Sequence, residues 1–175
     1  VHQGCEVFVF TRSEAHRALA RSLGAVWAGS AETDPGVLMD SSIIFAPAGW
    51  LVPLALQRLD KGGTLALGGP NSYGGTTTVS GGVLRAENAG ALGTTAGGTV
   101  VISGARLELS GGLTFSGEAL TISGNGGDAF GALRSSSGVN EWAGPVTLGA
   151  NQARLGVNGG DLVVKGDRIK VFAER

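Results

Sequence analysis

Four short apolar units, each closed by a Ser-Gly pair, restrict the fold of this chain more than any other feature of its sequence. They cover residues 100–104, 107–111, 113–117 and 120–124, and their closing glycines lie 7, 6 and 7 residues apart. Apolar side chains alternate with others in each unit, so one face of the segment can be buried. Strands this short are not stable by themselves, and stacking on neighbours supplies the missing contacts. We therefore expect a β-solenoid or a meandering sheet.

The distribution of glycine indicates two segments. Nine of the 32 glycines lie in residues 1–69, and 23 lie in residues 70–175. Glycine adopts positive φ angles at no steric cost, as the corners between short strands require. The change falls near Gly68-Gly69-Pro70, and glycine beside proline is typical of a boundary. We predict one segment over residues 1–69 and a second over residues 70–175.

The overall composition excludes several classes of protein. Hydrophobic residues make up 42% of the chain and the net charge is −1, which argues against intrinsic disorder. A pI of about 6.1 without a basic cluster argues against a nucleic-acid partner. A single cysteine excludes an intramolecular disulfide framework and a cysteine-rich zinc site. We expect no membrane span, because no uncharged run reaches the ~20 apolar residues that a span needs. Residues 1–4 (VHQG) lack the features of a targeting segment and an initiator Met, so we expect a fragment or a processed chain.

The first segment has the pattern of alternating strands and helices. We predict a helix that begins after Ser13, its N-cap, and stops at Gly24. Ala15, Leu19 and Leu23 form one apolar stripe along it. Short strands alternate with this helix and with a second one, and this order indicates parallel β-α-β units. The remaining elements are strands over residues 6–10, 26–28, 42–46 and 63–67 and the second helix over residues 51–59.

Four stretches of this segment resemble the nucleotide-binding domain of zinc-dependent medium-chain alcohol dehydrogenases. They are residues 4–13 (GCEVFVFTRS), 19–25 (LARSLGA), 42–49 (SIIFAPAG) and 56–65 (LQRLDKGGTL). The resemblance covers residues 1–69 and begins at the second strand of that domain. It implies an incomplete Rossmann-like segment, because the first strand and the Gly-x-Gly-x-x-Gly turn that binds pyrophosphate do not precede Gly4.

The same resemblance implies one remnant of a cofactor site, at Thr11, Arg12 and Ser13. An acidic residue at this point selects NAD, whereas an arginine suits the 2′-phosphate of NADP. The alternative is an ordinary solvated arginine beside a helix N-cap. NADP is the implied cofactor only if the missing first strand is supplied; otherwise we expect none. We predict no catalytic residue and no metal site, because Cys5, His2 and His16 do not match the zinc ligands of the family.

The second segment resembles the passenger-associated repeat of bacterial autotransporters. The resemblance covers residues 63–165 and implies a right-handed parallel β-helix on an exported adhesin or surface protein. Glu141 and Ala143 depart from the pattern, since a small polar residue is commoner at both positions. The stretches that carry it are residues 71–85 (NSYGGTTTVSGGVLR), 88–93 (NAGALG), 131–134 (GALR) and 139–148 (VNEWAGPVTL).

The two resemblances overlap at residues 63–69, where one strand fits both patterns and a fusion is expected. The predicted fold class is therefore mixed: a truncated Rossmann-like β-α-β segment followed by a mainly-β right-handed parallel β-helix. We predict a non-enzymatic structural segment of an autotransporter-like passenger, at the cell surface. The alternative is a cytoplasmic fragment of an NADP-type alcohol dehydrogenase that is inactive alone. Partners would be a surface ligand or a second copy of the chain, through the ends of the solenoid.

A few single residues receive structural rather than functional roles. We expect Trp142 to be a core or corner aromatic residue. Asn71, Asn88 and Asn140 are expected to support turns or to stack between successive strands. We also predict that residues 1–60 shield the N-terminal end of the solenoid, because an open end exposes unpaired backbone groups.

Overall fold

The computed structural model describes residues 4–45, 48–149, 152–165 and 169–171. The chain is mostly β, with parallel sheets and few helices. It divides into two compact units, residues 1–38 and residues 39–175. The predicted segments, which meet at residues 69 and 70, were defined by the distribution of glycine in the sequence, and that division stays a prediction.

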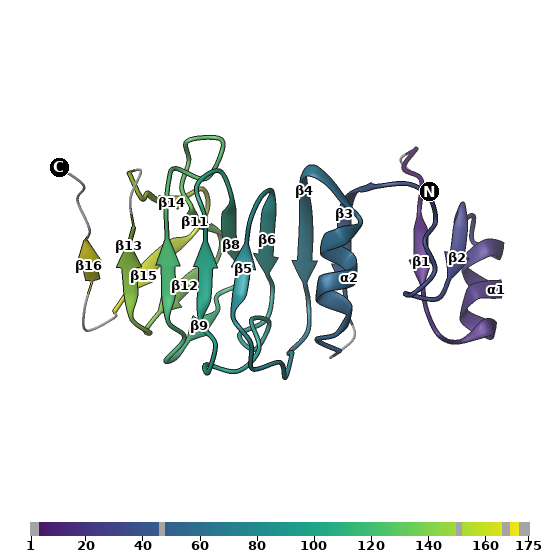
Figure 1. The fold of residues 1–175 in the computed structure, drawn as a ribbon, viewed down its shortest axis with the longest axis horizontal. Coiled ribbons are helices and arrows are strands. Elements are labelled where there is room, and N and C mark those ends of the chain that lie inside the picture. Colours follow the sequence, from purple (N-terminus) through teal and green to yellow (C-terminus); the bar gives the residue numbers. More distant parts are fainter. Residues whose placement is uncertain (1–3, 46–47, 150–151, 166–168, 172–175) are drawn as a thin grey trace. The chain divides into compact units, whose positions relative to one another are not determined.

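The first unit is a small parallel β-α-β arrangement (Figure 1). It contains β1 (Phe8–Phe10), α1 (Glu14–Ser22) and β2 (Trp27–Gly29). β1 and β2 pair in parallel with Phe8 opposite Trp27, as the predicted β-α-β pattern requires. The ring of Phe10 contacts that of Trp27 at a centroid distance of 4.9 Å.

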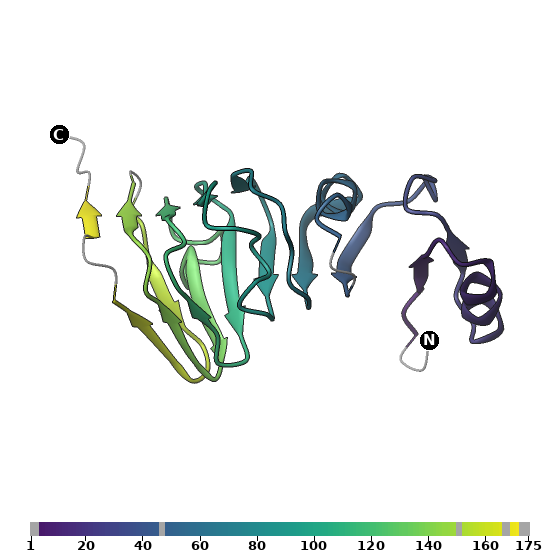
Figure 2. The ribbon, with the colours of Figure 1, turned by 90° about the horizontal axis from the view of Figure 1, so that it is seen from below.

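The predicted apolar stripe of α1 is largely exposed. Leu19 is 55% exposed, Leu23 is 70% exposed, and no residue of α1 is buried. α1 packs against only two strands (Figure 2), and a sheet of this width cannot cover the whole stripe. The Arg21 guanidinium donates to the Ala28 carbonyl over 2.7 Å and ties the helix to β2.

The second unit contains three sheets in which every neighbouring pair of strands is parallel. In sheet order, the six-stranded sheet contains β14 (Leu155–Val157), β11 (Leu133–Ser137), β8 (Arg106–Ser110), β6 (Val83–Ala86), β4 (Leu59–Leu67) and β3 (Met39–Ile44). The five-stranded sheet contains β16 (Ile169–Val171), β13 (Val146–Leu148), β10 (Leu120–Ile122), β7 (Thr99–Val101) and β5 (Thr77–Val79). The three-stranded sheet contains β15 (Asp161–Val164), β12 (Val139–Trp142) and β9 (Thr114–Phe115).

The chain passes through the sheets in turn and then returns to the first, and we call one such passage a circuit. Thr77, Thr99, Leu120, Val146 and Ile169 occupy one register position in successive strands of the five-stranded sheet. Their numbers differ by 22, 21, 26 and 23, so each circuit takes 21 to 26 residues.

The four Ser-Gly units supply β7, β8, β9 and β10. The first three of these strands lie in three different sheets, and β10 returns to pair with β7. A meander would pair consecutive strands, so this pairing excludes the predicted meandering sheet. The Ser-Gly pairs follow strands at the points where the chain changes from one sheet to another.

Successive corners approach one another too closely for a side chain. Gly138 follows β11 with a φ of +73°, and a Cβ atom there would lie 2.6 Å from the Gly112 nitrogen of the preceding circuit. Gly160 has a φ of +71°, and its Cβ would overlap the Gly138 carbonyl oxygen. Corners stacked in this way account for part of the high glycine content.

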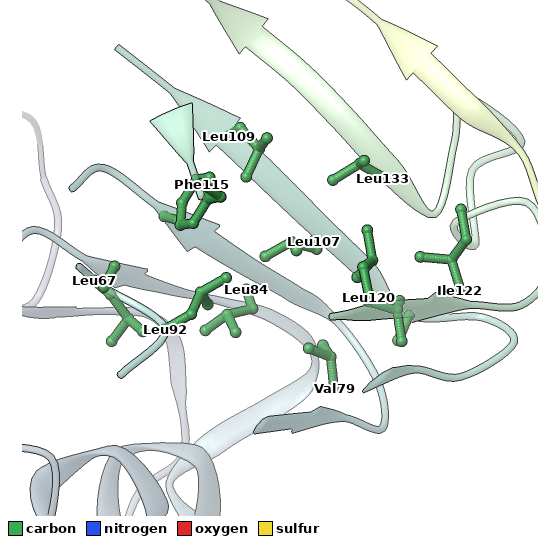
Figure 3. Close-up of a cluster of buried hydrophobic side chains, with 14 of the residues drawn as sticks. Leu67, Val79, Leu84, Leu92, Leu107, Leu109, Phe115, Leu120, Ile122 and Leu133 are labelled. Carbon is green, nitrogen blue, oxygen red and sulfur yellow. The ribbon is translucent and has the colours of Figure 1, made fainter. Parts of the chain in front are cut away.

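The inner faces of the sheets enclose one apolar core (Figure 3). Side chains from strands of different sheets point into it, including Leu84, Leu107 and Leu120. Trp142 is fully buried and stacks on Phe115 at a centroid distance of 4.9 Å, which confirms its predicted place in the core. The remaining large members are Leu65, Leu67, Val79, Leu92, Val101, Leu109, Ile122, Leu133 and Val146.

α2 (Leu51–Gln57) lies on the N-terminal side of these circuits and packs against β3 and β4. Val52 is buried in the common core, and Leu51 and Ala55 pack against it. The helix therefore covers part of the apolar core beside β3 and β4. That residues 1–60 shield the end of a solenoid stays a prediction.

We expect Gly138→Ala to reduce the free energy of unfolding by about 2–6 kcal/mol. The estimate adds the cost of a left-handed conformation at a non-glycine residue, ~1–3 kcal/mol, to that of overpacking, ~1–3 kcal/mol. Gly104→Ala is the matched control, because Gly104 has a φ of +90° with no atom within 4 Å of a Cβ. Urea denaturation of both variants separates backbone strain from close contact. Equal losses in the free energy of unfolding in Gly138→Ala and Gly104→Ala would contradict the close approach of Gly138 to Gly112.

Candidate functional site

The loop between β1 and α1 brings together the predicted cofactor residues Thr11, Arg12 and Ser13. The Ser13 hydroxyl accepts a hydrogen bond from the His16 amide over 3.3 Å, which confirms Ser13 as the N-cap of α1. The Thr11 hydroxyl accepts from the Ser13 amide over 3.4 Å. Both hydroxyl groups therefore stabilise the turn into the helix.

Arg17 holds this loop against the first turn of α1. Its Nε donates to the Thr11 carbonyl over 2.9 Å, and a terminal nitrogen donates to the Arg12 carbonyl over 3.4 Å. Its other terminal nitrogen binds Glu14 at 3.0 Å. The backbone of the loop is thus fixed, while the Arg12 side chain is exposed.

Glu32 brings a negative charge into the same neighbourhood. The Ser30 hydroxyl donates to its carboxylate over 2.6 Å and is the main reason that the pKa of Glu32 is lowered. Its own backbone amide lowers the pKa further, and the positive charges of Arg12 and Arg17 add to the effect. An anion that binds Arg12 must therefore compete with a carboxylate that already interacts with this charge.

A second notable group, Glu118, lies inside the second unit. Its side chain is 4% exposed and its Oε1 accepts a hydrogen bond from the Thr99 hydroxyl over 2.8 Å. Burial raises the pKa of Glu118, and the hydrogen bond from Thr99 offsets part of that rise. The Glu118 carbonyl accepts from the Trp142 indole over 3.0 Å. Glu118 therefore links neighbouring circuits twice, through its carboxyl group to Thr99 and through its backbone carbonyl to Trp142.

One feature of the sequence points to Glu118, although no motif includes this residue. Glu118 is the only charged residue between Glu108 and Asp128. A lone acidic residue among short apolar strands is unusual, because burying an unpaired carboxylate is costly. Thr99, its hydrogen-bond partner, is 19 residues away, and only the pairing of β7 with β10 brings the two regions together.

An apolar cavity of about 420 Å³ lies between α2 and β5. The Thr77 hydroxyl donates to the Tyr73 hydroxyl over 2.9 Å at its wall, and burial raises the pKa of Tyr73. The lining contains no charged residue, so the cavity offers space for an uncharged group but no acid–base pair. It is formed by Gly49, Val52, Pro53, Leu56, Tyr73, Gly75, Thr76, Thr77, Thr78, Val79, Ser80, Gly81 and Leu84.

Asn140 supports a corner, as predicted. Its side chain is fully buried, and its Oδ1 accepts from the Leu113 amide over 2.8 Å. Its Nδ2 donates to the Ser135 hydroxyl over 2.7 Å and to the Ser137 carbonyl over 2.8 Å. The amide thus satisfies backbone groups of two successive circuits.

The side chains of Asn71 and Asn88 also form hydrogen bonds with the backbone, at different distances along the sequence. The Asn88 Oδ1 accepts from the Gly90 amide over 2.9 Å and closes a tight turn. The Asn71 Nδ2 donates to the Ala91 carbonyl over 2.8 Å, across 20 residues of sequence. Asn88 therefore supports a turn and Asn71 links segments 20 residues apart, which are the two kinds of role predicted for these asparagines.

Among the residues that the structure describes, no three His, Cys, Asp or Glu side chains form a group that could hold a metal ion. In the same described residues, neither helix has the length and apolar character needed to cross a bilayer.

Comparison with known proteins supports the dehydrogenase-like part of the chain. A probable alcohol dehydrogenase, AdhA, of Mycobacterium tuberculosis (strain CDC 1551 / Oshkosh) is 49% identical over 67 residues. These residues are 38% of this chain and 19% of the relative, so the chain spans less than one fifth of that protein. No protein-family model and no solved structure matches the chain. The autotransporter resemblance receives no support from these comparisons and rests on the residues quoted for it.

We expect Glu118→Gln to change how stability depends on pH. The folded protein raises the pKa of Glu118 above its ordinary value of 4.5. The stabilising contribution of the protonated form is therefore complete below pH 4.5 and is lost as the pH rises through the folded-state pKa. Relative to wild type, Glu118→Gln should gain stability as the pH rises from 4 towards neutrality, measured by urea denaturation.

Glu87→Gln is the control for this measurement, because Glu87 is an exposed carboxyl group. Like Glu118→Gln, this variant removes one carboxylate, so a difference in stability between the two variants is specific to position 118. A constant difference in stability between Glu118→Gln and wild type from pH 4 to 8 would contradict the raised pKa.

Proposed function

We propose that the N-terminal part of this chain is a segment of the nucleotide-binding domain of an NADP-type zinc-dependent alcohol dehydrogenase. The observation that carries the proposal is the 49% identity over 67 residues to a protein described as a probable alcohol dehydrogenase. In this proposal the segment has no catalytic activity by itself and contributes nucleotide contacts through Thr11, Arg12 and Ser13.

The geometry of the loop supports a contact with the 2′-phosphate of NADP. Arg12 follows β1 and precedes α1, where an arginine accommodates this phosphate in dinucleotide-binding folds. The N-terminus of α1 favours a bound anion, because the first amide N–H groups of the helix and the positive end of its dipole lie there. The exposed Arg12 side chain is accessible to such a group.

Glu32 limits the expected affinity. Its carboxylate interacts with the charges of Arg12 and Arg17 and would repel a phosphate bound beside them. The proposal therefore expects weak binding, in the millimolar range, which corresponds to about −4 kcal/mol.

We expect the full chain to bind NADPH more tightly than NADH, and Arg12→Gln to abolish this preference. A hydrogen bond to a charged group contributes ~1.5–3 kcal/mol, so the loss should be about tenfold or more. Glu32→Gln should strengthen NADPH binding, because it removes the competing charge. Isothermal titration calorimetry measures the binding of NADPH and NADH to the unchanged chain and to the Arg12→Gln and Glu32→Gln variants.

Lys61→Gln is the matched control, since it removes an exposed positive charge from β4, outside the first unit. The cofactor part of the proposal fails if NADPH does not bind at millimolar concentration. Equal loss of binding in Lys61→Gln would point to non-specific attraction of a phosphate.

A second candidate function is favoured by the geometry of residues 39–175. We infer that the three sheets form a right-handed parallel β-helix that acts as a non-enzymatic structural segment of a surface protein. Successive strands in one register position, 21 to 26 residues apart, support this architecture. Two further features support this architecture: the hydrogen bonds of buried Asn140 and the close approach of Gly160 to Gly138. In each case one corner lies directly on another.

We expect a far-UV circular dichroism spectrum of β type with a small helical contribution. The two helices, α1 and α2, contain 9 and 7 residues of a chain of 175. A spectrum dominated by helix would exclude the β-helix. An assay with NADP, zinc and short-chain alcohols should give no turnover, and measurable turnover would contradict a purely structural function.

A further inference from the structure

We propose that the cavity between α2 and β5 binds a small uncharged molecule. The molecule has an apolar body of about two rings and one oxygen atom that accepts a hydrogen bond from Tyr73. The cavity belongs to the second unit, because its described lining runs from Gly49 to Leu84. The proposal uses the geometry of these residues and is independent of the cofactor contact proposed for Arg12.

The cavity lies where a helix, rather than a strand, adjoins the apolar interior. β5 is an end strand of the five-stranded sheet, whereas the six-stranded sheet continues past β6 to β4 and β3. Between β3 and β4 the chain forms α2, which packs against these two strands and buries Val52 in the core. The side chains of the helix do not follow the edge of β5, so a space of about 420 Å³ separates the two elements.

The volume of the cavity suits a molecule larger than a single ring. Small-molecule sites usually have volumes of roughly 300–1,000 Å³, and this cavity falls within that range. An apolar cavity of about 150 Å³ holds benzene, so there is room here for two rings with a substituent. Thr76, Thr78 and Ser80 line the cavity and are exposed, so it opens to solvent and a ligand can enter.

The chemistry of the lining favours an uncharged and largely apolar ligand. Val52, Val79 and Leu84 contribute buried aliphatic side chains, and Leu56 is 40% exposed at the same wall. None of the described lining residues is charged. A charged ligand would lose its hydration without gaining an opposite charge, which is costly. An apolar ligand instead gains about 25 cal/mol for each Å² of its surface removed from water.

Tyr73 has a hydrogen-bond donor that the protein uses only weakly. Its hydroxyl accepts from the Thr77 hydroxyl over 2.9 Å, so its own proton is directed elsewhere. That proton is donated to the Ala91 carbonyl over 3.5 Å, much longer than the ~2.7–2.8 Å of an ordinary O–H···O bond. The same carbonyl accepts from Nδ2 of Asn71 over 2.8 Å. The Tyr73 hydroxyl can therefore turn to a ligand without leaving the Ala91 carbonyl unpaired.

The ring of Tyr73 is held in place at the wall of the cavity. A Cβ atom at Gly49 would lie 2.7 Å from Cδ1 of the ring, and one at Gly93 would lie 2.8 Å from Cδ2. Backbone therefore approaches both edges of the ring and limits its movement. Burial raises the pKa of Tyr73, the hydrogen bond from Thr77 offsets part of that rise, and the charge of Glu118 adds to it. The hydroxyl thus keeps its proton at neutral pH and can donate it.

The test compares the binding of α-tetralone and tetralin to the full chain, because these two-ring molecules differ by a single carbonyl group. We expect both to bind, and α-tetralone to bind about two- to tenfold more tightly, which is the advantage that one neutral hydrogen bond confers. Titration followed by NMR of the methyl groups measures both the affinity and the position of the ligand. The largest shifts should occur at Val52, Leu56, Val79 and Leu84.

Two variants test the donor and the space separately. Tyr73→Phe keeps the ring but removes the hydroxyl, so it should lower the affinity for α-tetralone to that for tetralin and leave tetralin binding unchanged. Leu56→Trp fills the cavity from a partly exposed position and should weaken the binding of both molecules roughly tenfold or more. Val139→Trp is its matched control, because Val139 is 59% exposed in β12 and does not line the cavity. It should bind both molecules as the unchanged chain does.

The proposal is overturned if neither molecule binds, if α-tetralone has no advantage over tetralin, or if Tyr73→Phe keeps that advantage. Unchanged binding to Leu56→Trp, or methyl shifts confined to residues outside the lining, would also overturn it. The comparison on the unchanged chain and the position of the shifts decide the question even if a variant unfolds. Arg12→Gln should leave both affinities unchanged, so failure of the NADPH titration would not affect this result.

Discussion

The close approach of backbone at the corners is the constraint on which the second unit depends. Parallel strands pair only if the chain returns to the same register after each circuit, and each return brings one corner against the next. At Gly138 and Gly160 the distance between corners leaves no space for a Cβ atom. Glycine therefore acts here through its small size as well as its conformational freedom. Without these contacts, β8, β11 and β14 could not lie side by side and enclose the core.

Close corners create a second requirement, because their backbone groups are removed from water. Each buried N–H or C=O needs a partner, and an unpaired one costs ~1–3 kcal/mol. Asn140 satisfies this requirement from within the interior, with partners in two circuits. Glu118 solves a similar problem differently, since its carbonyl accepts from Trp142 while its carboxyl group takes a proton more readily. The polar interior thus links the sheets, and the apolar core alone does not specify their alignment.

Local features of the fold could be predicted from the sequence, whereas long-range ones could not. Ser13 and Gly24 marked the ends of α1, and the Ser-Gly units marked four strands, because caps and corners depend on neighbouring residues. The pairing of β7 with β10 depends on residues some 20 positions apart, which periodicity alone does not reveal. The exposure of Leu19 was missed for a related reason: an amphipathic stripe indicates which face is apolar, but not how much sheet is present to cover it. The hydrogen bond between Thr99 and Glu118 exists only through strand pairing.

β4 shows why two unrelated sequence patterns can meet without a break in structure. Residues 63–67 of this strand are predicted to fit both a nucleotide-binding domain and a repeated sheet, and in the structure β4 lies between β3 and β6. A parallel edge offers regularly spaced backbone groups and accepts any strand that supplies the opposite groups and a buried apolar face. Leu65 and Leu67 provide that face, since both are fully buried. The proposed nucleotide binding has stricter requirements, because it would need particular side chains at particular positions around Arg12. A sheet can therefore continue across a junction of sequence patterns where a binding site cannot.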